Sequence, residues 1–181
     1  MDDKQLKHIS KFLSKHLRHT PEALGLILAE GGWVTVEALL AACQKRSFPI
    51  TLAQLQEVVA KNDKQRFAFD ATGELIRANQ GHSVEVDLQL ESIAPPRALY
   101  HGTATDDDAS IMQEGLKRMQ RHHVHLSVDI ETAKKVGTRH GVPVVFAVNA
   151  ALMASEGFLF YRSANGVWLV DEVPPKYLKR L

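Results

Sequence analysis

The stretch Arg66–Asn79, RFAFDATGELIRAN, decides how the first half of this chain is interpreted. Apolar and polar residues alternate on both sides of Ala71-Thr72-Gly73, whose composition is typical of a turn. Alternation with a period of two places successive side chains on opposite faces of a strand. The stretch therefore predicts a β-hairpin, and the elements before it decide what kind of domain the hairpin closes.

Two helices are predicted upstream of this hairpin. The first should end at Thr20-Pro21, because a residue that precedes proline is pushed out of the helical region. After a turn at Gly31-Gly32 and a short extended piece at Trp33-Val34, Thr35 is expected to cap the second. That second helix should run to about Lys45.

A third helix is predicted between the second one and the hairpin. Thr51 and Gln54 have the spacing of a capping box in front of the apolar run LAQLQEVVAKN. Three helices followed by a hairpin form a winged-helix pattern. Such a fold binds nucleic acid in some proteins and serves as a plain interaction module in others.

The first helix is amphipathic, with cations concentrated on one side. Between Lys4 and His19 there are five Lys and Arg residues and no acidic residue, and a helical wheel places all five within roughly 80°. These cations are Lys4, Lys7, Lys11, Lys15 and Arg18. A solvated surface explains such a stripe in many helices. Because acidic residues usually share a solvated face, however, a phosphate-bearing polymer is a reasonable partner.

The totals describe an ordinary globular protein. The chain has 181 residues, 45% of them hydrophobic, and a formal net charge of +1, which does not by itself indicate a nucleic-acid binder. Its single cysteine, Cys43, excludes an internal disulfide and falls in a helical pattern that predicts a core position. No apolar run reaches about 18 residues, and the N-terminus does not resemble a signal peptide. A reducing cytoplasm is the expected location, and a monomer is the default expectation.

The second half is richer in strands. We expect a domain boundary near Pro95-Pro96, which gives an N-terminal domain of residues 1–92 and a C-terminal domain of residues 93–181. The predicted strands are ALYHGT, HVHLS, PVVFAVNA, GFLFYRS and GVWLVDEVP, with helices near 106–114 and 129–137. The predicted class is therefore α+β, a helical winged domain followed by a domain of short strands and helices.

The densest group of functional side chains lies in Met119–Ser127, MQRHHVHLS. If HHVHLS (122–127) is a strand, Arg121, His123 and His125 share one face with Ser127, while Val124 and Leu126 pack inward. A metal site, satisfied structural histidines and a phosphate or sugar contact all remain open on this pattern alone. Arg121 favours phosphate, because a guanidinium binds an anion well and a dication poorly.

Familiar nucleotide-binding and hydrolase motifs are absent from the sequence. It contains neither GxGxxG after a strand nor GxxxxGK[ST], so the two common glycine-rich phosphate loops are excluded. It also lacks the GxSxG motif of a serine nucleophile. Any phosphate chemistry must therefore rest on a different set of residues.

Seven segments, read together, resemble the NAD-dependent RNA 2′-phosphotransferase family. They occur in the family's order and cover about residues 4 to 178. The segments are KHLRHTP (15–21), DKQRFAF (63–69), IRANQGHS (76–83), LYHGT (99–103), RHHVHLSVD (121–129), VGTRHGVPVV (136–145) and NGVWLVDEVP (165–174). Each is weak alone, whereas the ordered set is specific.

This resemblance implies an RNA-binding winged-helix lobe and an ADP-ribosyltransferase-type lobe, with the active site between them. The implied reaction removes an internal 2′-phosphate from a tRNA-like RNA. The phosphate attacks C1″ of NAD⁺ and releases nicotinamide, and the ribose 2″-hydroxyl then attacks phosphorus. The products are 2′-hydroxyl RNA and ADP-ribose 1″,2″-cyclic phosphate. The implied catalytic residues are Arg18, His19, Arg66 and Arg121.

The residue types suit that chemistry. A 2′-phosphate carries nearly two negative charges, and arginines supply bidentate donors for the charge that develops at phosphorus. No metal is then required, because guanidinium groups can take the part that Mg²⁺ plays in many phosphoryl transfers. A histidine near neutrality, here His19, can move a proton or donate to the phosphate.

The resemblance also implies an NAD⁺ site at the end of the strand LYHGT. Its members are His101, Gly102, Thr103, Ser127 and Arg139. Many members of the wider ADP-ribosyltransferase superfamily have a glutamate near NGVWLVDEVP, where this chain has Val167 and Trp168. An anionic phosphate needs no base to become a nucleophile, so an additional carboxylate would only repel it.

Two other interpretations follow from the same residues. One keeps ADP-ribosyltransferase chemistry but acts on another phosphate or on a nucleic-acid end. The other is a non-catalytic winged-helix regulator that senses NAD⁺, and the complete arginine–histidine set argues against it. The sequence does not name the natural RNA.

Overall fold

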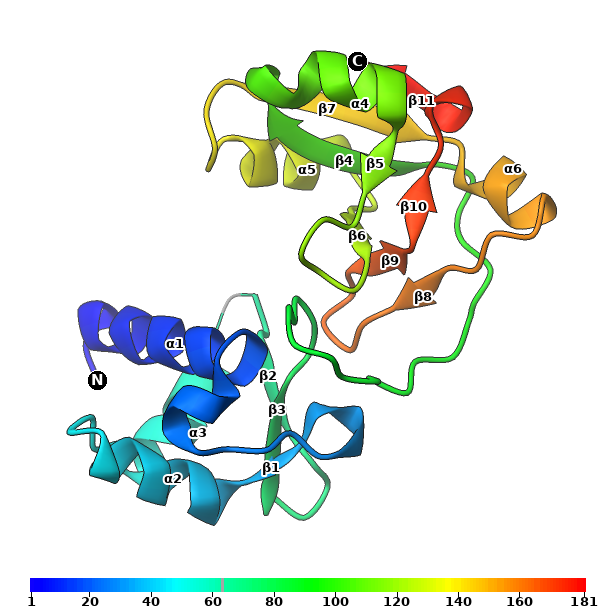
Figure 1. Ribbon diagram of the computed structural model, residues 1–181. Helices are drawn as coiled ribbons and strands as arrows, with labels where there is room; N and C mark the ends of the chain where they lie inside the picture. Colours follow the sequence, from blue (N-terminus) through cyan, green and yellow to red (C-terminus); the bar gives the residue numbers. More distant parts are fainter. Residues whose placement is uncertain (63) are drawn as a thin grey trace. The chain divides into compact units, whose positions relative to one another are not determined.

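The chain forms two compact units, Met1–Gln89 and Leu90–Leu181, in a computed structural model that describes residues 1–62 and 64–181 (Figure 1). Both units combine helices with small antiparallel sheets, which confirms the predicted α+β class. The boundary expected from the sequence, after residue 92, lies three residues beyond this division. Among the described residues, no helix combines the length and apolar character needed to cross a bilayer.

The N-terminal unit has its helices before its hairpin, as predicted. The α-helices are α1 (Asp3–Arg18), α2 (Val36–Lys45) and α3 (Leu52–Ala60), with 3₁₀ turns η1 (Pro21–Leu24) and η2 (Glu30–Gly32). The strands are β1 (Val34–Thr35), β2 (Phe67–Phe69) and β3 (Leu75–Ala78), in the order β1-β3-β2. The hairpin prediction is confirmed, and β1 adds a third antiparallel strand along the free edge of β3.

Local hydrogen bonds explain where these helices begin and end. Arg18 is the last residue of α1, before the turn that contains Pro21. The Thr35 hydroxyl accepts a hydrogen bond from the backbone N–H three residues later, at 3.1 Å. Thr51 and Gln54 form both hydrogen bonds of a capping box. The predicted caps are therefore confirmed.

The core of the N-terminal unit fixes the orientation of α1. Leu13 and Leu17 are fully buried on its inner side, together with Leu39 of α2 and Leu55 of α3. Replacing one such leucine by alanine typically costs about 2–5 kcal/mol. Cys43 also lies in this core as predicted, and burial raises the pKa of its thiol to about 11. The cationic side of α1 is thereby held outward.

The C-terminal unit is built from shorter elements. Its helices are α4 (Asp108–Glu114), α5 (Ile130–Gly137) and α6 (Ala150–Ser155), with 3₁₀ turns η3 (Thr105–Asp107) and η4 (Pro175–Tyr177). Its strands are β4 (Leu99–Ala104), β5 (Leu116–Lys117), β6 (Val124–Leu126), β7 (Pro143–Val148), β8 (Tyr161–Arg162), β9 (Trp168–Val170), β10 (Glu172–Val173) and β11 (Leu178–Arg180).

These strands form three small antiparallel sheets, ordered β11-β7-β4, β6-β9-β8 and β10-β5. The longest pairing joins β4 and β7, from Leu99 opposite Val148 to Ala104 opposite Pro143. In Figure 1, α5 lies along β4 and β7. Three residues that the resemblance assigns to NAD⁺ lie within β4, so this sheet and α5 position them. They are His101, Gly102 and Thr103.

The strand predicted at HVHLS (123–127) is confirmed in part, whereas the expectation that Arg121 shares one of its faces is wrong. β6 contains only Val124–Leu126, and Val124 and Leu126 are buried as expected. Met119 has a left-handed backbone with φ of 54°, and the Arg121 N–H donates to the Arg118 carbonyl at 3.0 Å. Arg121 therefore lies in a turn before the strand, not on its face.

Candidate active site

Arg18 and His19 lie where α1 ends, and a distant segment holds both. The Ser83 backbone N–H donates to the Arg18 carbonyl at 2.9 Å, and the Ser83 hydroxyl lies 2.9 Å from Nδ1 of His19. The Arg18 side chain lies against Gly81, where an added Cβ would stand 3.5 Å from Nη1. The geometry of the Arg18-His19 pair thus depends on residues 81–83.

Arg66 is held through two asparagines. Its Nη1 donates to Oδ1 of Asn62 at 3.1 Å, while Nδ2 of Asn62 donates to Ser10 of α1 at 3.0 Å. The Asn79 N–H donates to the Arg66 carbonyl at 2.8 Å, and the Asn79 side chain donates to the Gln65 carbonyl at 2.6 Å. The side chain and backbone of Arg66 are therefore both tied to neighbouring segments.

One segment after β3 thus connects the three N-terminal site residues. Asn79 binds the backbone at Arg66, and Ser83 binds the backbone and side chain at Arg18-His19. Sequence reasoning assigned no role to these positions. Their only signal was the segment IRANQGHS, which contributed to the family resemblance without a stated function.

In the C-terminal unit, a second group links His101, His125 and Arg121. Nδ1 of His101 lies 3.0 Å from the His125 carbonyl, so it carries the proton and leaves Nε2 as an acceptor in the neutral ring. Burial lowers the pKa of His101, the His125 carbonyl opposes this, and the charge of Arg121 lowers it further. Nη1 of Arg121 lies 3.2 Å from Nδ1 of His125.

Gly102 and Thr103 shape the strand end. A Cβ on Gly102 would lie 1.7 Å from the Ala133 carbonyl oxygen, so only glycine lets α5 pack this closely against β4. The buried Thr103 hydroxyl donates to Oδ2 of Asp107 at 2.9 Å. Gly102 has no side chain and the Thr103 hydroxyl is engaged by Asp107, so both positions offer their backbone groups to a ligand.

Ser127 and Arg139 occupy different surroundings. Ser127 exchanges two backbone hydrogen bonds with Tyr100, at 2.7 and 2.8 Å, which brings it beside β4 and His101. Arg139 is exposed in the turn after α5. Within residues 1–62 and 64–181 its side chain has no hydrogen bond or ion pair, and the structure does not join it to the His101 group.

His123 belongs to a separate contact. Its Nε2 lies 3.7 Å from Oδ1 of Asp171, and its ring packs against Tyr161. Burial lowers the pKa of His123, and Asp171 opposes this shift. Across the described residues, no three His, Cys, Asp or Glu side chains are grouped so that they could hold a metal ion.

These geometries provide two kinds of chemistry. Arg18, Arg66 and Arg121 are guanidinium donors of the kind that binds phosphate oxygens. His101 is kept neutral by its surroundings and offers an acceptor nitrogen, which suits a sugar hydroxyl. The arginines therefore suit an anionic ligand, and the neutral His101 ring suits a hydroxyl-bearing one.

Comparison with known proteins also indicates an enzyme that acts on a phosphate of RNA. The family described as RNA 2′-phosphotransferase, Tpt1 / KptA family, matches residues 4–172. A curated protein of Nostoc punctiforme, described as "Probable RNA 2′-phosphotransferase", is 62% identical over 181 residues, which is 100% of both chains. Proteins with the same description are 62% identical in Trichormus variabilis and 56% in Herpetosiphon aurantiacus, each over 98% of both chains.

A match over nearly the whole chain confirms the resemblance drawn from the seven ordered segments. The arginines and histidines of the site, and the residues that hold them, all fall inside residues 4–172. The chain belongs to the RNA 2′-phosphotransferase family of the Tpt1 / KptA type.

Proposed function

We propose that this chain removes an internal 2′-phosphate from RNA by transferring it to NAD⁺. Membership of the family supports phosphotransfer from RNA. The observation that carries the proposal is the anchoring of the Arg18-His19 pair and Arg66 by one segment, residues 79–83. A preorganised set of guanidinium donors stabilises the negative charge that develops at phosphorus in the transition state.

We assign the phosphate to Arg18, Arg66 and Arg121. Each guanidinium can donate two parallel hydrogen bonds to phosphate oxygens, and three such groups offset a nearly dianionic monoester. Arg66 is held by Asn62 and does not have to be ordered when RNA binds. These arginines take the place that a metal has in many phosphoryl transfers, so we propose that the reaction needs no metal.

We assign proton transfer to His19. Because Nδ1 is engaged by the Ser83 hydroxyl, Nε2 is the nitrogen that takes or gives a proton at the reacting oxygen. The hydrogen bond to Ser83 also fixes the orientation of the ring. Ser83 is thus a positioning residue for His19.

The residues around His101 fit NAD⁺. Nε2 of a neutral His101 can accept a hydrogen bond from a ribose hydroxyl, and the strand end at Gly102-Thr103 offers backbone groups to the nicotinamide amide. Ser127 lies beside this strand, and the exposed Arg139 suits the pyrophosphate. When bound, NAD⁺ supplies an electrophilic ribose carbon and a nicotinamide leaving group.

The finer assignments follow from this function. We propose that the N-terminal unit is a winged-helix, RNA-binding lobe and that the C-terminal unit is an ADP-ribosyltransferase-type, NAD⁺-binding lobe. The helix order and hairpin of the first, and the short antiparallel strands of the second, support this. We further propose a monomeric, cytoplasmic protein that acts in the processing of tRNA-like RNA.

An oligonucleotide with one internal 2′-phosphate tests the proposal. Removal of the phosphate is expected only when NAD⁺ is present and is expected to persist in EDTA. Removal without NAD⁺ would contradict NAD⁺ dependence. Activity that EDTA abolishes and Mg²⁺ or Zn²⁺ restores would contradict the metal-free assignment. It would favour a role of His123 and His125 as metal ligands.

A further inference from the structure

The outer side of α1 carries four lysines in a continuous row, which we call the lysine stripe. Its members are Lys4, Lys7, Lys11 and Lys15. All four are exposed, while Leu13 and Leu17 on the opposite side of the helix are fully buried. At 1.5 Å per residue the stripe is about 16 Å long, and it runs toward Arg18 and His19.

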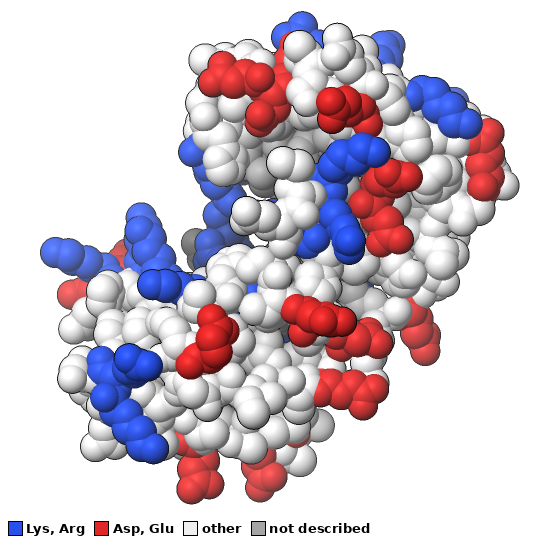
Figure 2. Space-filling model, viewed as in Figure 1, with Lys and Arg blue, Asp and Glu red and all other residues white. Residues whose placement is uncertain are grey.

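Ion pairing distinguishes these lysines from several others on the surface. Lys61 binds Glu57 at 2.7 Å, Lys117 binds Glu172 at 3.0 Å and Lys176 binds Glu156 at 3.3 Å. By contrast, no residue within 1–62 and 64–181 forms an ion pair with a lysine of the stripe. Figure 2 shows blue side chains gathered over α1. The stripe therefore presents uncompensated positive charge.

A cavity of about 270 Å³ lies beside the stripe, between the start of α1 and the loop before α3. It is lined by Gln5, His8, Ile9, Ser47, Phe48, Pro49 and Gln54. The His8 ring lies 5.1 Å from the Phe48 ring, which in turn stacks on Phe12 at 3.9 Å. The cavity thus offers planar apolar surfaces of the kind on which nucleobases stack.

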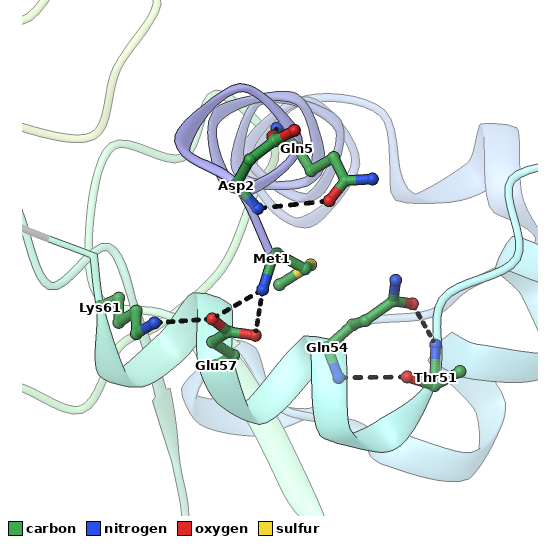
Figure 3. A network of polar contacts seen from close by, with 7 residues as sticks. All are labelled: Met1, Asp2, Gln5, Thr51, Gln54, Glu57 and Lys61. Carbon is green, nitrogen blue, oxygen red and sulfur yellow. Dashed lines mark hydrogen bonds and ion pairs between the residues drawn. The ribbon is translucent and has the colours of Figure 1, made fainter.

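The two glutamines of the cavity have a defined orientation. Oε1 of Gln5 accepts a hydrogen bond from the Asp2 N–H, and Oε1 of Gln54 accepts one from the Thr51 N–H (Figure 3). Because the backbone donors require oxygen at these positions, the amide NH₂ ends point away from them. Gln5 and Gln54 therefore offer hydrogen-bond donors to a ligand in the cavity.

We propose that this side of α1 binds single-stranded RNA next to the reacting phosphate. The lysine stripe holds backbone phosphates, and the cavity takes one unstacked base on the His8 and Phe48 rings, with its acceptors toward Gln5 and Gln54. A bilayer does not fit this helix, because its apolar side is buried in the core. The inference rests on the proposed function for the identity of the polymer.

The test compares two substrates in a variant that carries Lys4→Gln, Lys7→Gln, Lys11→Gln and Lys15→Gln. One is a 2′-phosphorylated trinucleotide, and the other is a 2′-phosphorylated strand of about 20 nucleotides. The variant should lose about 10-fold or more in kcat/KM on the long strand and keep wild-type kcat/KM on the trinucleotide. The log–log salt dependence of long-strand binding should decrease by roughly 3, about 0.7 for each lost phosphate contact.

A matched control removes the same charge elsewhere, through Lys117→Gln, Lys134→Gln, Lys176→Gln and Lys179→Gln in the C-terminal unit. An equal loss in this control would show a general effect of net charge and overturn the proposal. The proposal would also be overturned if the stripe variant lost kcat/KM equally on both substrates, or lost none on either. Anisotropy with an unphosphorylated strand measures binding without turnover, so failure of the surface is distinguishable from failure of the proposed reaction.

The base cavity has its own variant, His8→Ala, at an exposed position. Loss of one stacked base should weaken binding of the long strand at least about 5-fold and leave the salt dependence unchanged. A base analogue with stacking-sensitive fluorescence, placed in turn along the strand, should be quenched at one position in the wild type and not in the variant. Unchanged binding, or a change in the salt dependence alone, would overturn the base contact.

Discussion

Nδ1 of His19 lies 2.9 Å from the Ser83 hydroxyl, although the two residues are 64 positions apart in the chain. The same serine donates its backbone N–H to the Arg18 carbonyl, so two contacts with one residue fix the end of α1. An imidazole engaged at Nδ1 is restricted in rotation and presents Nε2 for chemistry. Ser83 thereby determines how His19 can take part in proton transfer.

Ser83→Ala should lower kcat by roughly 2- to 10-fold, the equivalent of one ordinary hydrogen bond. The KM for RNA should change little, because Ser83 is not assigned to the phosphate. Steady-state kinetics on a 2′-phosphorylated oligonucleotide would measure both quantities. The matched control is Ser155→Ala, which removes a serine hydroxyl that donates to the Leu152 carbonyl instead of contacting a histidine, and it should behave as wild type.

A double-mutant comparison separates positioning from general stability. In a His19→Ala background, Ser83→Ala should have no further effect on kcat, because the residue that it orients is gone. If the two losses multiply instead, Ser83 acts independently of His19 and its assignment is wrong.

Alanine at His19, Arg66 or Arg121 should slow the second chemical step more than the first. The attacking phosphate is already anionic, whereas the later step removes a hydroxyl proton while charge is redistributed at phosphorus. Losing one transition-state donor typically costs about 10²–10³-fold. At least one of the three variants should accumulate ADP-ribosylated RNA, seen as a slower gel band that forms only with NAD⁺. Loss of activity without such a band at any time would refute this division of labour.

The local elements of the N-terminal unit were predictable because their signals are local. Thr35 and Thr51 cap helices through backbone groups three residues away, and Pro21 excludes helix from the residue before it. The contacts of Asn79 and Ser83 join segments far apart in the sequence. No periodicity or cap predicts such contacts, so the residues that position the site were missed.

Gly102→Ala should strongly destabilise the C-terminal unit. The added Cβ would meet the Ala133 carbonyl oxygen at 1.7 Å, and α5 would have to move. Overpacking of this kind costs at least about 1–3 kcal/mol, which lowers the melting temperature by several degrees. Thermal unfolding followed by circular dichroism would measure the change.

Gly73→Ala is the matched control for this substitution. Gly73 has a positive φ, 77°, which Gly102 does not have, and nothing lies within 4 Å of a Cβ added to it. Gly73→Ala should lower the free energy of unfolding by only the roughly 1–2 kcal/mol that a left-handed backbone costs an alanine. A smaller effect at Gly102 than at Gly73 would show that β4 and α5 are not packed as described.

Acid should destabilise the fold partly through His101. Burial lowers the pKa of His101 below its ordinary 6.5, so the unfolded chain binds a proton at a higher pH than the folded one. The contribution of the neutral His101 ring to the free energy of unfolding is therefore complete above about pH 6.5. It is lost as the pH falls through the lower pKa of the folded state. Urea midpoints at several pH values should fall less steeply for His101→Gln than for wild type, and equal slopes would refute the assignment.

The C-terminal unit was less predictable for two physical reasons. β11 (Leu178–Arg180) is a short, mostly exposed edge strand, so it lacks the alternation that marks a half-buried strand. The period of two along HHVHLS extended the expected strand face back to Arg121, but the left-handed Met119 and the turn at Arg121 precede β6. Arg121 consequently meets His125 through a turn and not through a shared strand face.

The central claim is that phosphate leaves RNA by transfer to NAD⁺. An oligonucleotide whose 2′-phosphate carries a radioactive label tests this directly, when it is incubated with the wild-type protein and NAD⁺ and its products are separated. The account predicts that all the label appears in ADP-ribose 1″,2″-cyclic phosphate, with one nicotinamide released for each 2′-hydroxyl formed. Label released as inorganic phosphate, or removed without stoichiometric nicotinamide, would contradict it.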